Sequence, residues 1–240
     1  MYRPLVIGHA TAAGEAPANT LAGVRAALRS ADAMEIDVQL SADGIPVLMH
    51  DPNVDRTTNL RGPIRELTAE QLALADAGDG EPVPTLSQVL QLVQGHIAVF
   101  CELKATPGDA DQDTRLVEAV QRELAQHNAL DWTGIHSFSA AIVSHARIAD
   151  PRISVALISP PRDREESQRL LASAVTAGCQ AVSLQHSAVD AHFVQAAKFR
   201  QITTWTWTPD DESEWKRLAE AGVDGIITNH PARLRTMLGD

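Results

Sequence analysis

Three carboxylates and one lysine occupy strand-like runs of the sequence. Glu35 and Asp37 are separated by one residue, and so are Glu102 and Lys104. Because residues two apart on a strand face the same side, each pair shares a face. Carboxylate oxygens without cysteine are typical ligands of a hard cation such as Mg2+ or Ca2+. The spacing predicts a divalent-cation site at Glu35, Asp37 and Glu102. A salt-bridged layer with Lys104 as the counter-ion is the alternative interpretation.

Two histidines are candidates for proton transfer, since histidine titrates near neutral pH. His9 follows the run Leu5–Gly8, and His50 closes the run Ile45–His50. A single histidine at a strand end is more often structural, but two of them beside a carboxylate cluster indicate acid–base chemistry. Three further histidines at similar positions are not ranked above structural residues: His136, His186 and His230.

Two tryptophans, Trp205 and Trp207, alternate on one apolar run, so both are expected to face the same side of a strand. We expect at least one of them to pack in the core. Trp207 is the candidate for a platform on which a substrate rests.

The elements that must position these residues alternate along the chain. Short apolar runs predict eight strands: Leu5–Gly8, Met34–Leu40, Ile97–Leu103, Gly134–Phe138, Ile153–Ile158, Ala181–Leu184, Ile202–Trp207 and Gly225–Thr228. Stretches of helical period between them predict eight helices: Thr20–Ser30, Thr85–Val93, Asp111–His127, Ser139–Ala149, Arg164–Ala177, Asp190–Phe199, Asp211–Ala221 and Pro231–Leu238. This order predicts an α/β fold of the (β/α)8 or TIM-barrel type, with an open doubly wound sheet as the alternative.

One segment, about residues 41–77, departs from the strand–helix rhythm. It follows the second strand, and it contains a turn at Ala42-Asp43-Gly44, the short extra strand Ile45–His50 and a capped helical turn at Leu67–Glu70. Because the segment is too short for a core of its own, we expect a small insertion into a single domain that spans residues 1–240.

Composition narrows the class of protein. The chain has 240 residues, of which 44% are hydrophobic, and a formal net charge of -11. The apolar content favours a folded domain over disorder. The acidic balance argues against nucleic-acid binding, and the lack of an apolar run near the roughly 18 residues of a spanning helix argues against stable membrane insertion. Cys101 and Cys179 are expected to be buried thiols. We expect a cytoplasmic protein, and a homo-oligomer is compatible with the sequence.

Several motifs occur in a fixed order: Val6–His9, Ala16–Leu21, Glu35–Asp51, Asp55–Thr58, Glu102–Lys104, Trp205–Thr206 and Gly222–Pro231. In this order they closely resemble the glycerophosphodiester phosphodiesterase family, over essentially the whole chain. The resemblance implies a TIM barrel with a small insertion after the second strand. It also implies a phosphoric diester hydrolase that releases glycerol 3-phosphate and an alcohol from a small phosphodiester.

The resemblance also implies roles for individual residues. It places a divalent cation, Mg2+ or Ca2+, on the residues that match Glu35, Asp37 and Glu102, and it makes His9 and His50 the general acid–base pair. Lys104 matches a cation on the phosphate side, and with it we expect Asn19 and Trp207 to contact the substrate. The nucleophile is left open between the glycerol 2-hydroxyl, which would give a cyclic phosphate, and water.

Three positions depart from the family pattern: Ala10, Ala18 and Asn229. The family usually has arginine at the first, glutamate at the second and aspartate at the third. Loss of the arginine removes a fork-shaped cation for a phosphate, and Arg3, Arg56 and Arg61 are the candidates for a replacement. Two alternatives follow: a weakened barrel that binds a phosphate ligand without turnover, or a phosphodiesterase with a shifted substrate.

Overall fold

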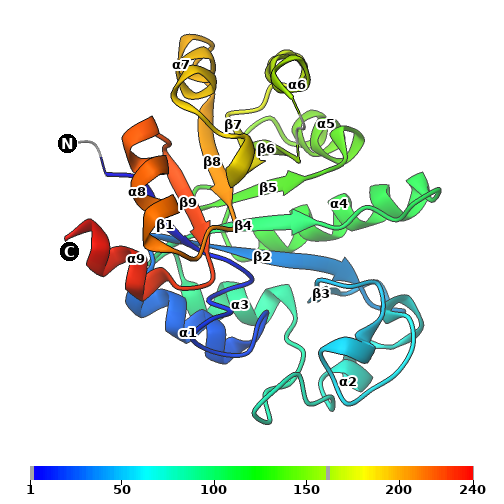
Figure 1. Cartoon of the computed structure of the whole chain (residues 1–240). Coiled ribbons are helices and arrows are strands. Elements are labelled where there is room, and N and C mark those ends of the chain that lie inside the picture. Colours follow the sequence, from blue (N-terminus) through cyan, green and yellow to red (C-terminus); the bar gives the residue numbers. More distant parts are fainter. Residues whose placement is uncertain (1–2, 161–162, 240) are drawn as a thin grey trace.

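Eight parallel strands close into a barrel in this computed structural model, which describes residues 3–160 and 163–239 (Figure 1). Closure follows from β1, which pairs in parallel with both β2 and β9. The predicted TIM barrel is therefore confirmed, and the open sheet is excluded. The barrel strands are β1 (Leu5–Gly8), β2 (Ala33–Leu40), β4 (Ala98–Leu103), β5 (Thr133–Ser137), β6 (Ser154–Ser159), β7 (Ala181–Gln185), β8 (Thr203–Trp207) and β9 (Gly225–Thr228).

The helices lie outside the strands and alternate with them. They are α1 (Leu21–Ser30), α3 (Leu86–Val93), α4 (Ala110–Gln126), α5 (Ala140–Ala149), α6 (Arg164–Thr176), α7 (Ala191–Phe199), α8 (Glu212–Ala221) and α9 (Pro231–Leu238). Most begin at a side chain that accepts a hydrogen bond from the first turn, as Thr20 does for α1 and Asp211 for α8. These local signals explain why the predicted boundaries lie within a few residues of the observed ones.

Apolar side chains form two separate cores in the barrel. The larger one lies between strands and helices and is built mainly from aliphatic residues. The smaller one fills the interior with Ile7, Ile227, Trp205 and several alanines. The rings of Trp205 and Phe100 lie 4.2 Å apart between centroids and close the barrel beneath its mouth. Trp205 is thus a core residue, as expected for one of the two tryptophans.

The insertion after β2 forms a small folded unit at the carboxyl end of that strand (Figure 1). It contains β3 (Pro46–Leu48), which pairs antiparallel with β2, the short helix α2 (Ala69–Leu72), and two 3-10 turns. The segment does have a small apolar core, contrary to the expectation that it is too short for one, because its turns and β3 fold over a cluster of buried side chains: Val47, Met49, Val54, Ile64, Leu72, Ala75 and Val83. The predicted extra strand and capped turn are both present, with Thr68 as the cap.

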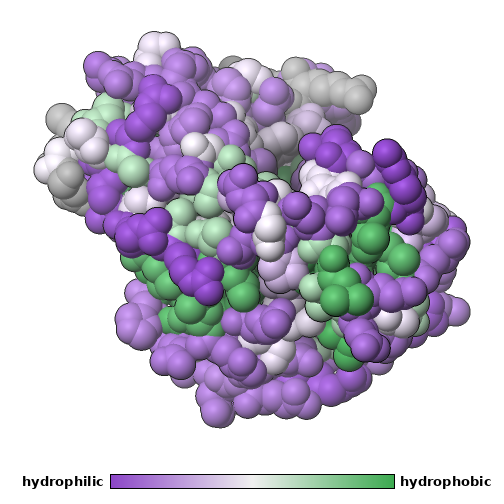
Figure 2. Space-filling view, turned by 90° about the horizontal axis from the view of Figure 1, so that it is seen from below, coloured by the Kyte–Doolittle hydropathy of each residue, from purple (hydrophilic) through white to green (hydrophobic). Residues whose placement is uncertain are grey.

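The surface seen in Figure 2 is mostly hydrophilic, and its apolar side chains gather in separate patches. Among the described residues, no helix has the length and apolar character to cross a membrane.

Candidate active site

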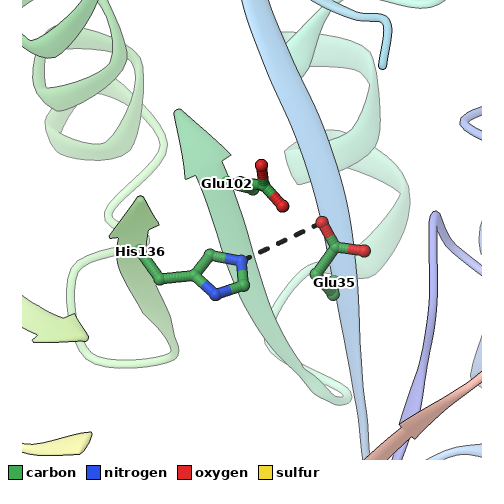
Figure 3. Close-up of side chains that lie close together, drawn as sticks. All are labelled: Glu35, Glu102 and His136. Carbon is green, nitrogen blue, oxygen red and sulfur yellow. Dashed lines mark ion pairs between the residues drawn. The ribbon is translucent and has the colours of Figure 1, made fainter. Parts of the chain in front are cut away.

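Acidic and imidazole side chains converge where the barrel strands end. Asp37 on β2 lies in register with Glu102 on β4, which lies in register with His136 on β5. Glu35 is two residues before Asp37 and faces the same interior. Figure 3 shows Glu35, Glu102 and His136 pointing toward one another from three neighbouring strands. One ligand atom from each of these three lies within 4.8 Å of the others.

Burial makes this cluster electrically unbalanced. Glu35, Asp37 and Glu102 are only 2%, 1% and 9% exposed. Lys104 is the cation among them: its Nζ lies 2.7 Å from Asp37 Oδ1 and also bonds the Glu102 carboxylate. One ammonium neutralises one of three carboxylates, so two negative charges would remain in a region with little water. Buried charges of this kind require a counter-ion or a proton.

Protonation equilibria reflect the same imbalance. Burial, followed by repulsion from Asp37 and Glu102, raises the pKa of Glu35 well above its ordinary value. Burial also raises the pKa of Glu102, although Lys104 opposes this shift. Burial acts on Asp37 in the same direction, but the charge and hydrogen bond of Lys104 bring its pKa below the ordinary range. The carboxylates closest to the lysine are therefore compensated best, and Glu35 least.

Buried polar atoms that make no hydrogen bond fit a divalent cation. Within residues 3–160 and 163–239, these include Glu35 Oε1 and both ring nitrogens of His136, and Glu35 Oε1 lies 3.9 Å from His136 Nε2 (Figure 3). Burial and the charge of Lys104 lower the pKa of His136 to about 3, so its imidazole is neutral and keeps a lone pair for a ligand. Carboxylate oxygens with an imidazole suit a divalent cation. The sequence analysis did not rank His136 above a structural residue, because only the pairing of β4 with β5 brings it beside Glu102.

Asn19 holds Asp37 on both sides. Its Nδ2 donates to Asp37 Oδ2 at 2.6 Å, and its Oδ1 accepts from the Asp37 backbone N–H at 3.1 Å. Asn19 is buried. This geometry favours a role in positioning Asp37, while direct contact between Asn19 and a substrate stays a prediction.

The two predicted acid–base histidines have different partners. His9 Nδ1 lies 2.7 Å from the amide oxygen of Asn229, whereas His50 Nδ1 lies 2.7 Å from the Asp51 carboxylate. Hydrogen bonds with Arg56 and then with His50 lower the pKa of Asp51 to about 2, although burial opposes this shift. Asp51 is therefore ionised at neutral pH.

Gln39 fixes the loop that carries His50. Its Nε2 donates to the backbone oxygens of Met49 and Asp51 at 2.9 and 2.7 Å. In addition, the Met49 backbone N–H donates to Asp37 O at 3.0 Å. The insertion is thereby tied to β2 directly beside the carboxylate cluster.

Two cavities of about 240 Å³ each share His9 and His50 in their linings. The first is the barrel mouth, lined by Glu35 and Glu102 and by Phe138 and Trp207, whose rings meet edge to face at 5.7 Å. The walls of the second include Ala10, Ala13, Ala18 and Arg56. The two cavities therefore flank the histidine pair.

Other candidates lie elsewhere. His186 bonds Glu214 on α8. Arg3 pairs with Asp32, and Arg61 lies 3.6 Å from Asp55 with its side chain 81% exposed. The two cysteines are free and buried, as expected.

The whole chain has known relatives. Residues 9–233 match the model of the glycerophosphoryl diester phosphodiesterase family. The Bacillus subtilis protein YhdW is 31% identical over 94% of each chain. A glycerophosphodiester phosphodiesterase of Caldanaerobacter subterraneus is 30% identical over 97% of this chain and 96% of its own. An Oleispira antarctica phosphodiesterase, solved with its product sn-glycerol-3-phosphate, superposes with a TM-score of 0.90 at 27% identity, over 99% of this chain and 97% of that one.

Substitution of an acidic residue of the cluster should weaken cation binding, and substitution of its lysine should strengthen it. We expect Glu35→Gln and Glu102→Gln each to weaken Mg2+ or Ca2+ binding by about tenfold or more, because each removes a charged ligand. Lys104→Met should strengthen binding, because it removes an ammonium that repels the ion. Isothermal titration calorimetry measures both effects, with Glu118→Gln on the outer face of α4 as the control. Unchanged affinity in the two glutamate variants would exclude a cation site in this cluster.

Proposed function

The chain belongs to the glycerophosphoryl diester phosphodiesterase family, and we propose that it acts as a single-domain, cation-dependent hydrolase that converts glycerophosphodiesters into glycerol 3-phosphate and an alcohol. One observation carries the proposal: a buried, charge-unbalanced carboxylate cluster lies beside two histidines at the mouth of the barrel. This combination suits hydrolysis of a phosphodiester, because a bound cation would compensate negative charge on the phosphoryl oxygens and the histidines would transfer protons.

Glu35, Glu102 and Asp37 would hold the cation, Mg2+ or Ca2+, and His136 is close enough to join them. When bound, the cation would neutralise charge on the phosphoryl oxygens. Lys104 faces the same cavity and supplies a second positive charge to the phosphate. Phe138 and Trp207 offer apolar faces on which the carbon chain of the glycerol can rest.

His9 and His50 divide the proton transfers. The nucleophilic hydroxyl, from water or from the glycerol 2-position, loses its proton as it attacks phosphorus, and the leaving alcohol oxygen gains one as its bond to phosphorus breaks. His50 lies against an ionised carboxylate, whereas His9 lies against a neutral amide. We therefore assign His50 as the donor to the leaving alcohol and His9 as the acceptor from the nucleophile.

The basic activity is tested by release of glycerol 3-phosphate from sn-glycero-3-phosphocholine. We expect a chelator to abolish release and added Mg2+ or Ca2+ to restore it. His9→Ala should lower kcat by about 10²–10⁴-fold, the usual contribution of a general base. Activity that survived both changes would contradict the proposal, and ligand binding without product would favour the alternative of a barrel that binds phosphates without turnover.

The assignment of donor and acceptor is tested by changing the leaving group. His50→Ala should lose about 10²–10⁴-fold with the choline ester but less than about tenfold with a p-nitrophenyl ester, whose leaving group departs without a proton. His9→Ala should lose the same factor with both esters. His145→Ala on α5 is the control. If the p-nitrophenyl ester rescued His9→Ala instead, the two roles would be reversed.

Arg56 is our candidate to replace the arginine that the family usually has at position 10. Ala10 and Ala18 leave a cavity, and Arg56 lies in its wall. The Arg56 Nε bonds Asp51, while its two terminal nitrogens make no hydrogen bond to the described part of the chain. These two terminal nitrogens can donate hydrogen bonds to two phosphate oxygens at once. The second cavity would then hold the alcohol portion of the diester.

The role of Arg56 predicts a rescue. Arg56→Met should raise KM at least about tenfold, and Arg56→Lys should recover only part of the loss, because an ammonium lacks the fork. Ala10→Arg alone should not increase activity, but in the Arg56→Met background it should restore binding. If Ala10→Arg alone increased activity and Arg56→Met left KM unchanged, the arginine of the family would simply be missing here and Arg56 would not replace it.

A further inference from the structure

A carboxylate outside the cluster, Asp210, lies behind His9 on the loop after β8. Its Oδ1 accepts hydrogen bonds from Thr228 Oγ1 at 2.8 Å and from the Asn229 backbone N–H at 2.9 Å. Its Oδ2 accepts from the Asn229 side chain, with Nδ2 at 2.6 Å. Asn229 Oδ1 in turn lies 2.7 Å from His9 Nδ1. Asp210 therefore reaches the imidazole only through an amide.

This chain of hydrogen bonds has one consistent direction. An ionised carboxylate only accepts, so the amide nitrogen of Asn229 must face Asp210 and its oxygen must face His9. A carbonyl oxygen cannot donate, so His9 Nδ1 must carry the hydrogen. The lone pair that can accept a proton is then on Nε2. A neutral His9 in this tautomer can accept a proton at one nitrogen only.

Rigid elements hold the three residues in place. His9 follows β1 and Thr228 is the last residue of the neighbouring strand β9, and the His9 backbone N–H donates to Thr228 O at 2.9 Å. On the other side, the buried indole of Trp215 donates to Pro209 O at 2.8 Å, immediately before Asp210. The loop carrying the carboxylate is thus fastened to α8.

We propose that Asp210 is a positioning residue for the proton acceptor: by orienting the Asn229 amide, it fixes His9 in the tautomer whose Nε2 is free to take the proton of the nucleophile. The inference rests on the proposed role of His9. It assigns a function to Asn229 as well, at a position where the family usually has aspartate. Here the Asn229 amide oxygen is the acceptor for His9 Nδ1, and Asp210 sets the direction in which that amide points.

Exchanging the two side chains tests this relay. In Asp210→Asn the obligatory acceptor is lost, so the Asn229 amide can turn its nitrogen toward His9. We expect kcat to fall about 10–100-fold, with KM within about threefold. In Asn229→Asp two carboxylates face each other, and activity should also fall. The double variant D210N/N229D again offers His9 an acceptor and pairs an amide with a carboxylate, so its kcat should exceed that of either single variant.

The tautomer itself can be read without catalysis, from the ¹⁵N chemical shifts of the His9 ring at a pH where the ring is neutral. We expect hydrogen on Nδ1 in the parent protein and the double variant, and a shift toward the Nε2–H form in Asp210→Asn. Asp224→Asn is the control. Asp224 immediately precedes β9, and like Asp210 its side chain accepts a hydrogen bond from a backbone N–H, that of Thr204. It should leave the His9 spectrum unchanged.

The outcomes separate the two proposals. An inactive parent protein with the expected His9 spectrum would refute the proposed function and leave the relay intact. An unchanged spectrum and kcat in Asp210→Asn would overturn the relay. A double variant whose kcat did not exceed that of the less active single variant would also overturn the relay, because the direction of the amide would then not matter.

Discussion

The burial of three carboxylates beside one lysine is the constraint on which the site depends. Water cannot solvate these charges, and Lys104 compensates mainly Asp37 and Glu102. Glu35 is left with a raised pKa and a buried oxygen that accepts no hydrogen bond. Such an arrangement is costly unless a cation completes it. The barrel can sustain it because adjacent strands hold the side chains in register and the Trp205–Phe100 pair closes the interior below them.

The insertion after β2 contributes as much to the proposed chemistry as the barrel does. It carries His50, the Asp51 carboxylate that faces it, and Arg56, and its small apolar core keeps these residues in place. Gln39 and the backbone of Asp37 bind the insertion to the strand that also carries the acidic pair. One strand therefore positions both the cation site and one of the two histidines.

The two histidines differ in what lies behind them, and that difference is the basis of the separate tasks that we propose for them. His50 faces an ionised carboxylate, whereas His9 faces an amide that separates it from Asp210. The second cavity, opened where Ala10 and Ala18 stand, adds space on the side of Arg56. Under the proposed function, the family reaction is retained because Arg56 supplies a cation for the phosphate and Asn229 supplies an acceptor for His9.

The sequence by itself determined the barrel, the insertion and the family, because strand and helix periods, caps and motif order are local properties. It also determined that Glu35 shares a strand face with Asp37, and Glu102 with Lys104, since residues two apart on a strand share a face. The register between β2 and β4 then placed Glu102 beside Asp37. Only the tertiary structure brought His136 beside Glu102, turned Asn19 onto Asp37 and set Asp210 behind His9. These contacts depend on strand register and on loops far apart in the chain, and no spacing within a single segment encodes them.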